Sequence, residues 1–138
     1  MVKIIMGLKG TGKTKTLIEM VNGSAAEEHG SVICIEKDQK LRYDISHKAR
    51  LVSAADYNIS DYAGFYGFIC GIIAGNFDIT DIYIDSVTKI CGRNENMDDL
   101  SKFIEAIDKL AENINITMTV SYDAQYAPEF IKSHFINA

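Results

Sequence analysis

Near the start of the chain, two glycines with four residues between them are followed at once by a lysine and a threonine: Gly7, Gly12, Lys13 and Thr14. Glycines allow positive φ angles and close approach of the backbone, so successive amide groups can converge on an anion. A lysine can reach the β- and γ-phosphates of a nucleotide, and a threonine hydroxyl is a suitable ligand for Mg²⁺. This spacing therefore predicts a phosphate-binding loop in which Lys13 contacts the phosphates and Thr14 the metal.

An apolar run precedes this motif, and a helical segment follows it. Residues 2–6 are typical of a short buried strand, and residues 15–21 predict a helix. A helix in that place points its unpaired N–H groups and partial positive charge at the same phosphates. The alternative is a glycine-rich turn that binds nothing, and the strand and the helix on either side argue against it. We expect nucleotide contacts from Gly7, Leu8, Lys9, Gly10, Thr11, Gly12, Lys13, Thr14 and Lys15.

The length and the charge of the chain limit the classes of protein to consider. With 138 residues, the chain can bury one hydrophobic core, so we expect a single nucleotide-binding domain over residues 1–138. A formal net charge of −5 argues against a general nucleic-acid-binding surface. We therefore expect a nucleotide, and no nucleic acid, as the ligand.

The cysteines and the apolar runs indicate the compartment. Cys34, Cys70 and Cys91 lack metal-binding spacing and lie in apolar contexts, which favours free thiols in a reducing cytoplasm. The first apolar run is too short for a signal peptide, and the uncharged run within residues 62–75 falls short of the ~18–20 residues that a membrane span needs. We expect a cytoplasmic protein with no membrane partner.

Expected strands and helices alternate along the rest of the chain. Such alternation is typical of an α/β fold, here a three-layer α/β/α sandwich with a mainly parallel sheet, in which ligands bind beyond the carboxyl ends of the strands. Strands are predicted at 31–35, 81–85 and 116–121, with 50–53 as a further candidate. Helices are predicted at 62–75, 98–113 and 129–135, and the first helix is expected to be interrupted at 22–24.

Four glycines recur at helical spacing in the apolar segment 62–75, at positions 64, 67, 71 and 75. Each glycine costs a helix about 1 kcal/mol relative to alanine, so a close approach should exploit them. One interpretation is a contact face for a partner helix. The interpretation that we favour is internal, with the smooth side of the helix lying tightly against the sheet.

Two acidic residues close predicted strands and are candidates for chemistry. Asp85 ends the apolar run that begins at residue 81, which favours a role beside Thr14 in holding Mg²⁺. Many nucleoside triphosphatases carry glutamate at the next position, but here it is Ser86. Glu36 ends the second strand at the same edge of the sheet and is the candidate catalytic base, with Asp38 nearby. The alternative for Asp85 is a turn residue or helix cap at the end of the strand, and the alternative for Glu36 and Asp38 is a solvated, charged loop.

These features resemble those of a known family. The segment Asp85-Ser86-Val87-Thr88 resembles the Walker B segment of RecA-like ATPases, and residues 7–14 have the form of their Walker A loop. In that family the catalytic glutamate ends the second strand, as Glu36 does here. The resemblance implies the P-loop NTPase fold of the RecA-like type, and sensing roles for Ser121 or Gln125.

The sequence favours a protein that binds Mg-ATP, with Lys13 and Glu36 as catalytic residues and slow hydrolysis as the expected activity. One alternative is a non-catalytic nucleotide-binding or protein-interaction module. Another is a nucleoside-type kinase, because residues 42–47 resemble a segment of thymidine kinases, although these carry a glutamate where Ser86 stands. No guanine-reading Asn-Lys-x-Asp motif is present, which favours ATP over GTP. A protein partner or a homo-oligomer is left open, with Arg93 among the candidates to act in trans.

Overall fold

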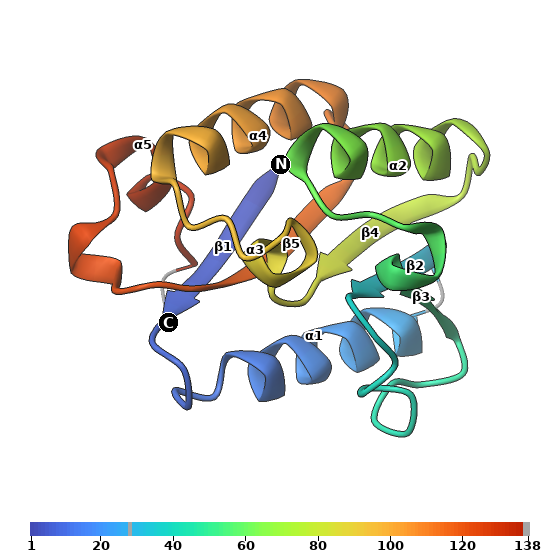
Figure 1. Ribbon diagram of the computed structural model, residues 1–138. Coiled ribbons are helices and arrows are strands. Elements are labelled where there is room, and N and C mark those ends of the chain that lie inside the picture. Colours follow the sequence, from blue (N-terminus) through green and yellow to red (C-terminus); the bar gives the residue numbers. More distant parts are fainter. Residues whose placement is uncertain (28, 137–138) are drawn as a thin grey trace.

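Five parallel strands form the sheet at the centre of the molecule, in the order β1-β5-β4-β2-β3 (Figure 1). The computed structural model describes residues 1–27 and 29–136. The strands are β1 (Val2–Gly7), β2 (Ser31–Glu36), β3 (Ala49–Ser53), β4 (Ile79–Ile84) and β5 (Asn115–Ser121). The segment at 50–53, a candidate from the sequence, is therefore a strand.

The helices cover both faces of this sheet. Helix α1 (Lys13–Glu27) lies on one face, and α2 (Tyr62–Ala74) and α4 (Met97–Leu110) lie side by side on the other (Figure 1). The chain crosses the sheet in one direction from β1 to β3 and returns from β3 to β5. Because parallel crossovers are right-handed, this reversal puts the helices on opposite faces. The predicted three-layer α/β/α sandwich is confirmed.

Short helical segments lie at the ends of the strands and in the connections between them. They are α3 (Val87–Ile90), α5 (Glu129–Lys132) and the 3₁₀ turns η1 (Ala54–Tyr57) and η2 (Ala124–Tyr126). The chain leaves β1 in one direction across the sheet and leaves β5 in the other. In open α/β sheets, the crevice at such a switch point is where ligands bind, which places the expected site beyond the carboxyl ends of β1 and its neighbours.

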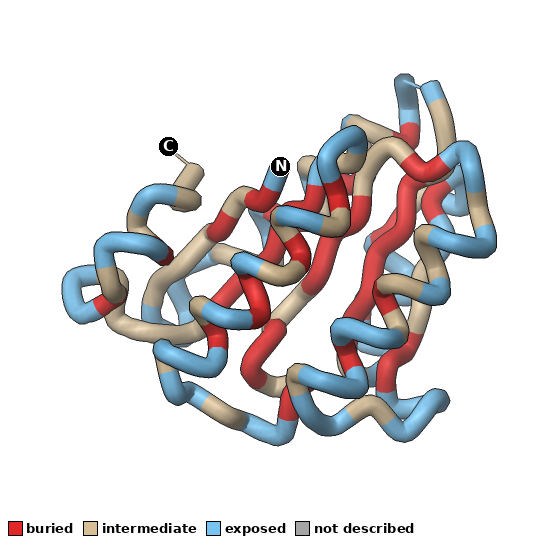
Figure 2. Tube along the Cα trace, turned by 90° about the horizontal axis from the view of Figure 1, so that it is seen from above, coloured by how far each residue is buried: buried red, intermediate tan, exposed pale blue. Residues whose placement is uncertain are grey.

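Each face of the sheet has its own hydrophobic core, seen in Figure 2 as buried segments along the strands and on the inner sides of the helices. Ile82 of β4 belongs to the core with α2 and α4, which also contains Leu100. The next residue, Tyr83, belongs to the core with α1, together with Leu17 and Cys34. Strands that are buried on both faces need apolar residues at successive positions, which explains the continuous apolar runs in the sequence.

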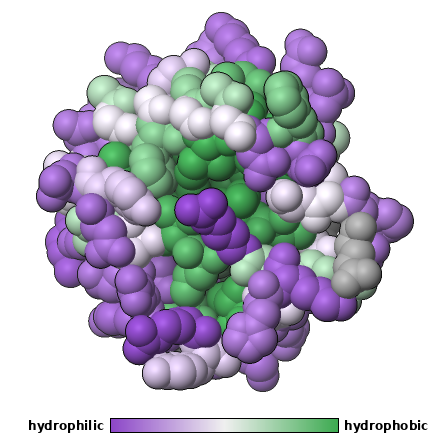
Figure 3. All heavy atoms as spheres, turned by 90° about the vertical axis from the view of Figure 1, so that its right-hand side faces the viewer, coloured by the Kyte–Doolittle hydropathy of each residue, from purple (hydrophilic) through white to green (hydrophobic). Residues whose placement is uncertain are grey.

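The two edges of the sheet differ. Beside β1, the Ile4 amide donates to the His134 carbonyl at 2.8 Å, and the Ile136 amide donates to the Ile4 carbonyl at 3.0 Å. The last described residues of the chain therefore cover this edge. Strand β3 forms the other edge, and Figure 3 shows that side of the molecule with apolar side chains around a hydrophilic one at its centre. Leu51 and Val52 of β3 are half-buried there.

Two helix boundaries differ from the predictions. The expected break at 22–24 is wrong, because α1 continues to Glu27. Its buried residues Leu17, Val21 and Ala25 recur every fourth position across that segment, and Gly23 lies on the exposed side. The last helix was predicted to extend to residue 135, but α5 ends at Lys132, since the chain then turns to pair with β1.

The internal interpretation of the glycine stripe is also wrong. Gly64, Gly67 and Gly71 are all exposed, and a Cβ atom added at either of the last two would meet nothing within 4 Å. Phe65 and Ile69 take the side of α2 that faces the core, and both are fully buried. The stripe of small residues therefore faces outward. Every helix among the described residues is too short or too polar to cross a bilayer.

The prediction of free thiols is confirmed. Cys34 and Cys91 are buried and Cys70 is half-buried, and none of the three forms a disulfide. Burial raises the pKa of Cys34 to about 12, with added contributions from Asp85 and Glu36. Burial likewise raises the pKa of Cys91 to about 12. Both thiols therefore stay neutral as parts of the two cores.

The outward position of the stripe predicts that Gly67→Ala stabilises the protein. The new methyl group meets open space, and alanine gives the unfolded chain less conformational entropy to lose than glycine does. The free energy of unfolding should therefore rise by about 0.4–1 kcal/mol. Urea unfolding followed by circular dichroism measures this. Gly30→Ala is the matched control and should destabilise, because its Cβ would fall close to the Asp78 carbonyl oxygen. A loss of stability in Gly67→Ala would contradict the outward placement.

Candidate functional site

The loop between β1 and α1 has the geometry that its glycines predict. Gly10 and Gly12 adopt φ angles of +86° and +84°, in the left-handed region that other residues rarely enter. A Cβ atom at Gly7 would lie 2.8 Å from the Thr11 hydroxyl oxygen, so a side chain there would force the loop to shift. The Thr11 hydroxyl itself donates to the Leu8 carbonyl at 2.7 Å, which closes the turn.

Lys13 folds over this loop. Its ammonium group donates to the Leu8 carbonyl at 2.9 Å. Burial lowers the pKa of Lys13, and the nearby Asp85 carboxylate partly opposes this shift. A phosphate in the loop would offer this ammonium a charged acceptor in place of a neutral carbonyl, which makes a stronger hydrogen bond.

The Asp85 carboxylate lies against the loop, as the sequence predicts. The Thr14 hydroxyl donates to Asp85 Oδ1 at 3.0 Å, and the Thr119 hydroxyl donates to the same oxygen at 3.0 Å. The Ser86 amide then donates to the Thr119 hydroxyl at 2.7 Å. Strand β5, which carries Thr119, lies between β1 and β4, so this hydroxyl connects Asp85 to the strand that separates it from the loop.

Thr119 was missed by the sequence analysis. It is 1% exposed, in a strand whose neighbouring residues Met118 and Val120 are fully buried and apolar. A hydroxyl between two apolar residues of a central strand was the available signal, because a buried hydroxyl must find a hydrogen-bond partner.

The oxygen atoms of Thr14 and Asp85 fit Mg²⁺. A hydroxyl and a carboxylate are hard ligands, and Mg²⁺ usually takes one or two protein oxygens together with waters and substrate phosphates. Adjacent ligands of an octahedral ion with bonds of 2.0–2.1 Å lie about 2.9 Å apart. The two oxygens here are separated by 3.0 Å. Both residues predicted as metal ligands are therefore brought together with suitable spacing.

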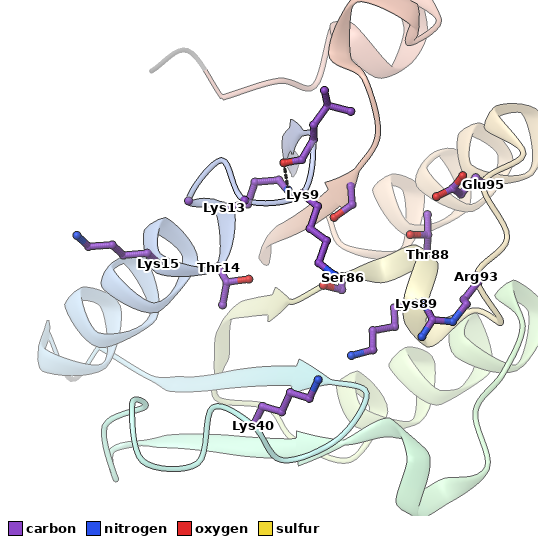
Figure 4. Close-up of a pocket in the computed structure, with 14 residues that line it drawn as sticks. Lys9, Lys13, Thr14, Lys15, Lys40, Ser86, Thr88, Lys89, Arg93 and Glu95 are labelled. Atoms are coloured by element: carbon purple, nitrogen blue, oxygen red, sulfur yellow. Dashed lines mark hydrogen bonds between the residues drawn. The ribbon is translucent and has the colours of Figure 1, made fainter.

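A cavity of about 740 Å³ lies over the loop (Figure 4). One wall is formed by the loop and the neighbouring end of β5, with Leu8, Lys9, Gly10, Gly12, Lys13, Thr14, Lys15 and Ser121. The other is formed by Lys40, Ser86, Thr88, Lys89, Arg93 and Glu95. Among these residues six are lysine or arginine and one is acidic. In a chain with a formal net charge of −5, so local an excess of positive charge indicates an anionic ligand.

Comparison with known proteins bears on the fold alone. No protein-family model and no curated protein sequence matches the chain. Among solved structures, the flagellar accessory protein FlaH from Methanocaldococcus jannaschii is similar, with a TM-score of 0.60 at 20% sequence identity. The match covers 96% of this chain and 65% of that protein. The chain has a RecA-like fold.

Within this RecA-like fold, Glu36 occupies the predicted place at the end of β2, but its carboxylate faces its own loop. The side chain is 4% exposed; its Oε1 accepts from the Lys40 amide at 3.0 Å and its Oε2 from the Leu41 amide at 2.9 Å. Glu36 is not among the residues that line the cavity. Its role as a base stays a prediction. Through these two hydrogen bonds, Glu36 also holds the loop after β2 in place.

The two residues expected to act as sensors lie in different surroundings. Ser121, at the end of β5, lines the cavity. Gln125 is exposed, and its amide groups donate to Asp123 in the turn that follows β5. Only Ser121 is therefore placed beside the loop. The Tyr122 amide donates to the Gly7 carbonyl at 3.1 Å and holds the end of β5 against the start of the loop.

The link through Thr119 predicts that Thr119→Val destabilises the protein by about 1–3 kcal/mol. The half-buried Ser86 amide loses its acceptor and the Asp85 carboxylate loses a donor, while the shape of the side chain is kept. Urea unfolding measures the change. Thr119→Ser keeps the hydroxyl and should cost only the lost methyl group, about 0.8 kcal/mol. Equal stability of Thr119→Val and the wild type would show that this hydroxyl does not support the site.

Proposed function

We propose that the chain binds Mg-ATP in the loop between β1 and α1 and hydrolyses it slowly. The observation that carries the proposal is that Lys13 and Thr14 line one cavity with an excess of positive charge, while the Asp85 carboxylate accepts a hydrogen bond from the Thr14 hydroxyl. In this assignment Lys13 and the loop amides hold the phosphates, and Thr14 and Asp85 hold Mg²⁺. The bound metal would offset the negative charge of the β- and γ-phosphates.

Slow hydrolysis follows from the surroundings of the acidic residues. Turnover needs a group that orients and activates water near the terminal phosphate. Ser86 follows Asp85 where a glutamate often stands, and both carboxylate oxygens of Glu36 already accept backbone hydrogen bonds. For Glu36 to act as the base, its buried carboxylate would have to move into the cavity and reach water there. The same hydrogen bonds, which hold the Glu36 carboxylate away from the cavity, support the alternative of a non-catalytic nucleotide-binding module.

Binding is tested by isothermal titration calorimetry with Mg-ATP. Lys13→Ala should weaken the affinity by about 10- to 100-fold, because a charged hydrogen bond to phosphate is lost. Lys102→Ala removes the same charge from the exposed side of α4, away from the cavity, and should leave the affinity unchanged. Absence of Mg-ATP binding by the wild type, or equal binding by Lys13→Ala, would refute the proposal.

Release of inorganic phosphate from Mg-ATP separates the slow enzyme from the module. We expect a turnover on the order of 10⁻⁴–10⁻² s⁻¹, the range of P-loop proteins in which the positioning of water or of the stabilising cation is incomplete. The measurement uses purified protein, with Lys13→Ala as the control for contaminating activity. Binding without release above that control would favour the module, and turnover above about 1 s⁻¹ would contradict the constraint on Glu36.

A further inference from the structure

Three cations lie together on the wall of the cavity that faces the phosphate-binding loop. Lys40 comes from the loop after β2, Lys89 from α3, and Arg93 from the segment that follows α3 (Figure 4). Figure 4 shows Lys40 and Lys89 reaching towards each other, with Arg93 beside Lys89. In the described part of the chain, none of the three forms a salt bridge with a carboxylate.

The pKa of Lys89 reflects how close these three groups are to one another. The contact with the Lys40 ammonium, followed by burial, lowers the pKa of Lys89. Arg93 lowers this pKa further, and Asp38 partly opposes the shift. Like charges held together cost free energy unless an anion compensates them. A group with two or more negative charges would relieve this repulsion at all three side chains.

The backbone holds this cationic wall in place on both sides. Glu36 binds the amide of Lys40 itself, and the Lys37 carbonyl accepts from the Ser53 hydroxyl at 3.0 Å. On the other side, the Arg93 amide donates to the Thr88 carbonyl at 2.7 Å, and Gly92 lies so close to Ser60 that a Cβ atom would meet the Ser60 carbonyl oxygen at 2.7 Å. The positions of the three cations therefore do not depend on one flexible loop.

The order of the strands decides which part of a nucleotide would meet this wall. Strand β2 is the neighbour of β4 on the side away from β1, so the segments after β2 and β4 lie beyond Asp85 as seen from the loop. The loop amides would hold the inner phosphates, Lys13 would reach the β- and γ-phosphates, and Thr14 and Asp85 would hold the metal. The group that extends from there towards the three cations is the terminal phosphate.

We infer that Lys40, Lys89 and Arg93 bind the terminal phosphate of the nucleotide, so that the cavity distinguishes a nucleoside triphosphate from a diphosphate. This inference rests on the proposed function, since it requires a nucleotide in the loop. It also makes Glu36 a positioning residue, which acts on the ligand through Lys40.

The test compares the affinities of Mg-ATP and Mg-ADP by calorimetry at constant ionic strength. Lys40→Ala and Lys89→Ala should each weaken Mg-ATP binding by about 10-fold or more, since each removes a charged hydrogen bond, while Mg-ADP binding changes by less than about twofold. Arg42→Ala is the matched control: it removes a charge from the same loop at an exposed residue outside the cavity, and should leave both affinities unchanged.

The outcomes separate this inference from the proposed function. If the wild type binds no Mg-ATP, the proposed function fails. If Mg-ATP binds and Lys13→Ala weakens it, but the ratio of ATP to ADP affinity in Lys40→Ala and Lys89→Ala stays that of the wild type, the inference is overturned. An equal loss of affinity for both nucleotides, or the same loss of affinity in Arg42→Ala, overturns it too. Either result would mean that the overall electrostatic field, and not a contact with the terminal phosphate, affects binding.

Glu36→Gln tests the positioning role. The Lys40 and Leu41 amides bond to different oxygens of Glu36, and glutamine replaces one of these oxygens with an NH₂ group that can only donate. One of the two amides therefore loses its acceptor, and we expect the ratio of ATP to ADP affinity to fall as it does in Lys40→Ala. Lys40→Arg keeps the charge and should retain the ratio. Loss of turnover in Glu36→Gln with the wild-type ratio would instead identify Glu36 as a base and overturn its positioning role.

Discussion

The carboxylate of Asp85 joins three parts of the fold at one oxygen atom, and the geometry of the site depends on it. Asp85 follows β4, whereas its partners Thr14 and Thr119 belong to α1 and β5. Because β5 separates β4 from β1, a carboxylate that reaches the loop must cross the end of β5. The Thr119 hydroxyl supplies a hydrogen-bond donor to the carboxylate at this point. An apolar residue there would remove one of the two hydroxyl groups that donate to the carboxylate, at a cost in free energy.

The parts of the site that the sequence predicts are those whose chemistry is local. The loop is recognisable because Gly10 and Gly12 need positive φ angles whatever lies around them, and Asp85 because it ends an apolar strand. Thr119 and Lys40 could not be predicted in this way. Their roles depend on which strands are neighbours, and the order β1-β5-β4-β2-β3 places segments side by side that are far apart in the chain.

Helix α2 illustrates the same limit for the fold. Its existence, its boundaries and the spacing of its glycines follow from the sequence, but the side that faces the sheet does not. The glycine side and the opposite side of this helix are both uncharged, so hydropathy alone does not show which of them faces the core. Size decides: Phe65 and Ile69 fill the space against the core, and the glycine side, which would leave that space empty, faces outward. Packing density, and not polarity, orients this helix.

Glu36 connects the architecture of the site to its expected rate. A buried carboxylate needs hydrogen bonds for both oxygens, and the amides of Lys40 and Leu41 supply them. A general base needs a free lone pair within reach of water. The Glu36 carboxylate is 4% exposed and lies outside the lining of the cavity, so catalysis by Glu36 requires the loop after β2 to release it towards water. That release would also free Lys40 from its place in the cavity. The hydrogen bonds that hold Lys40 in the cavity are therefore the ones that keep Glu36 away from water. Under the proposed function, this arrangement would favour retention of a triphosphate over its rapid hydrolysis.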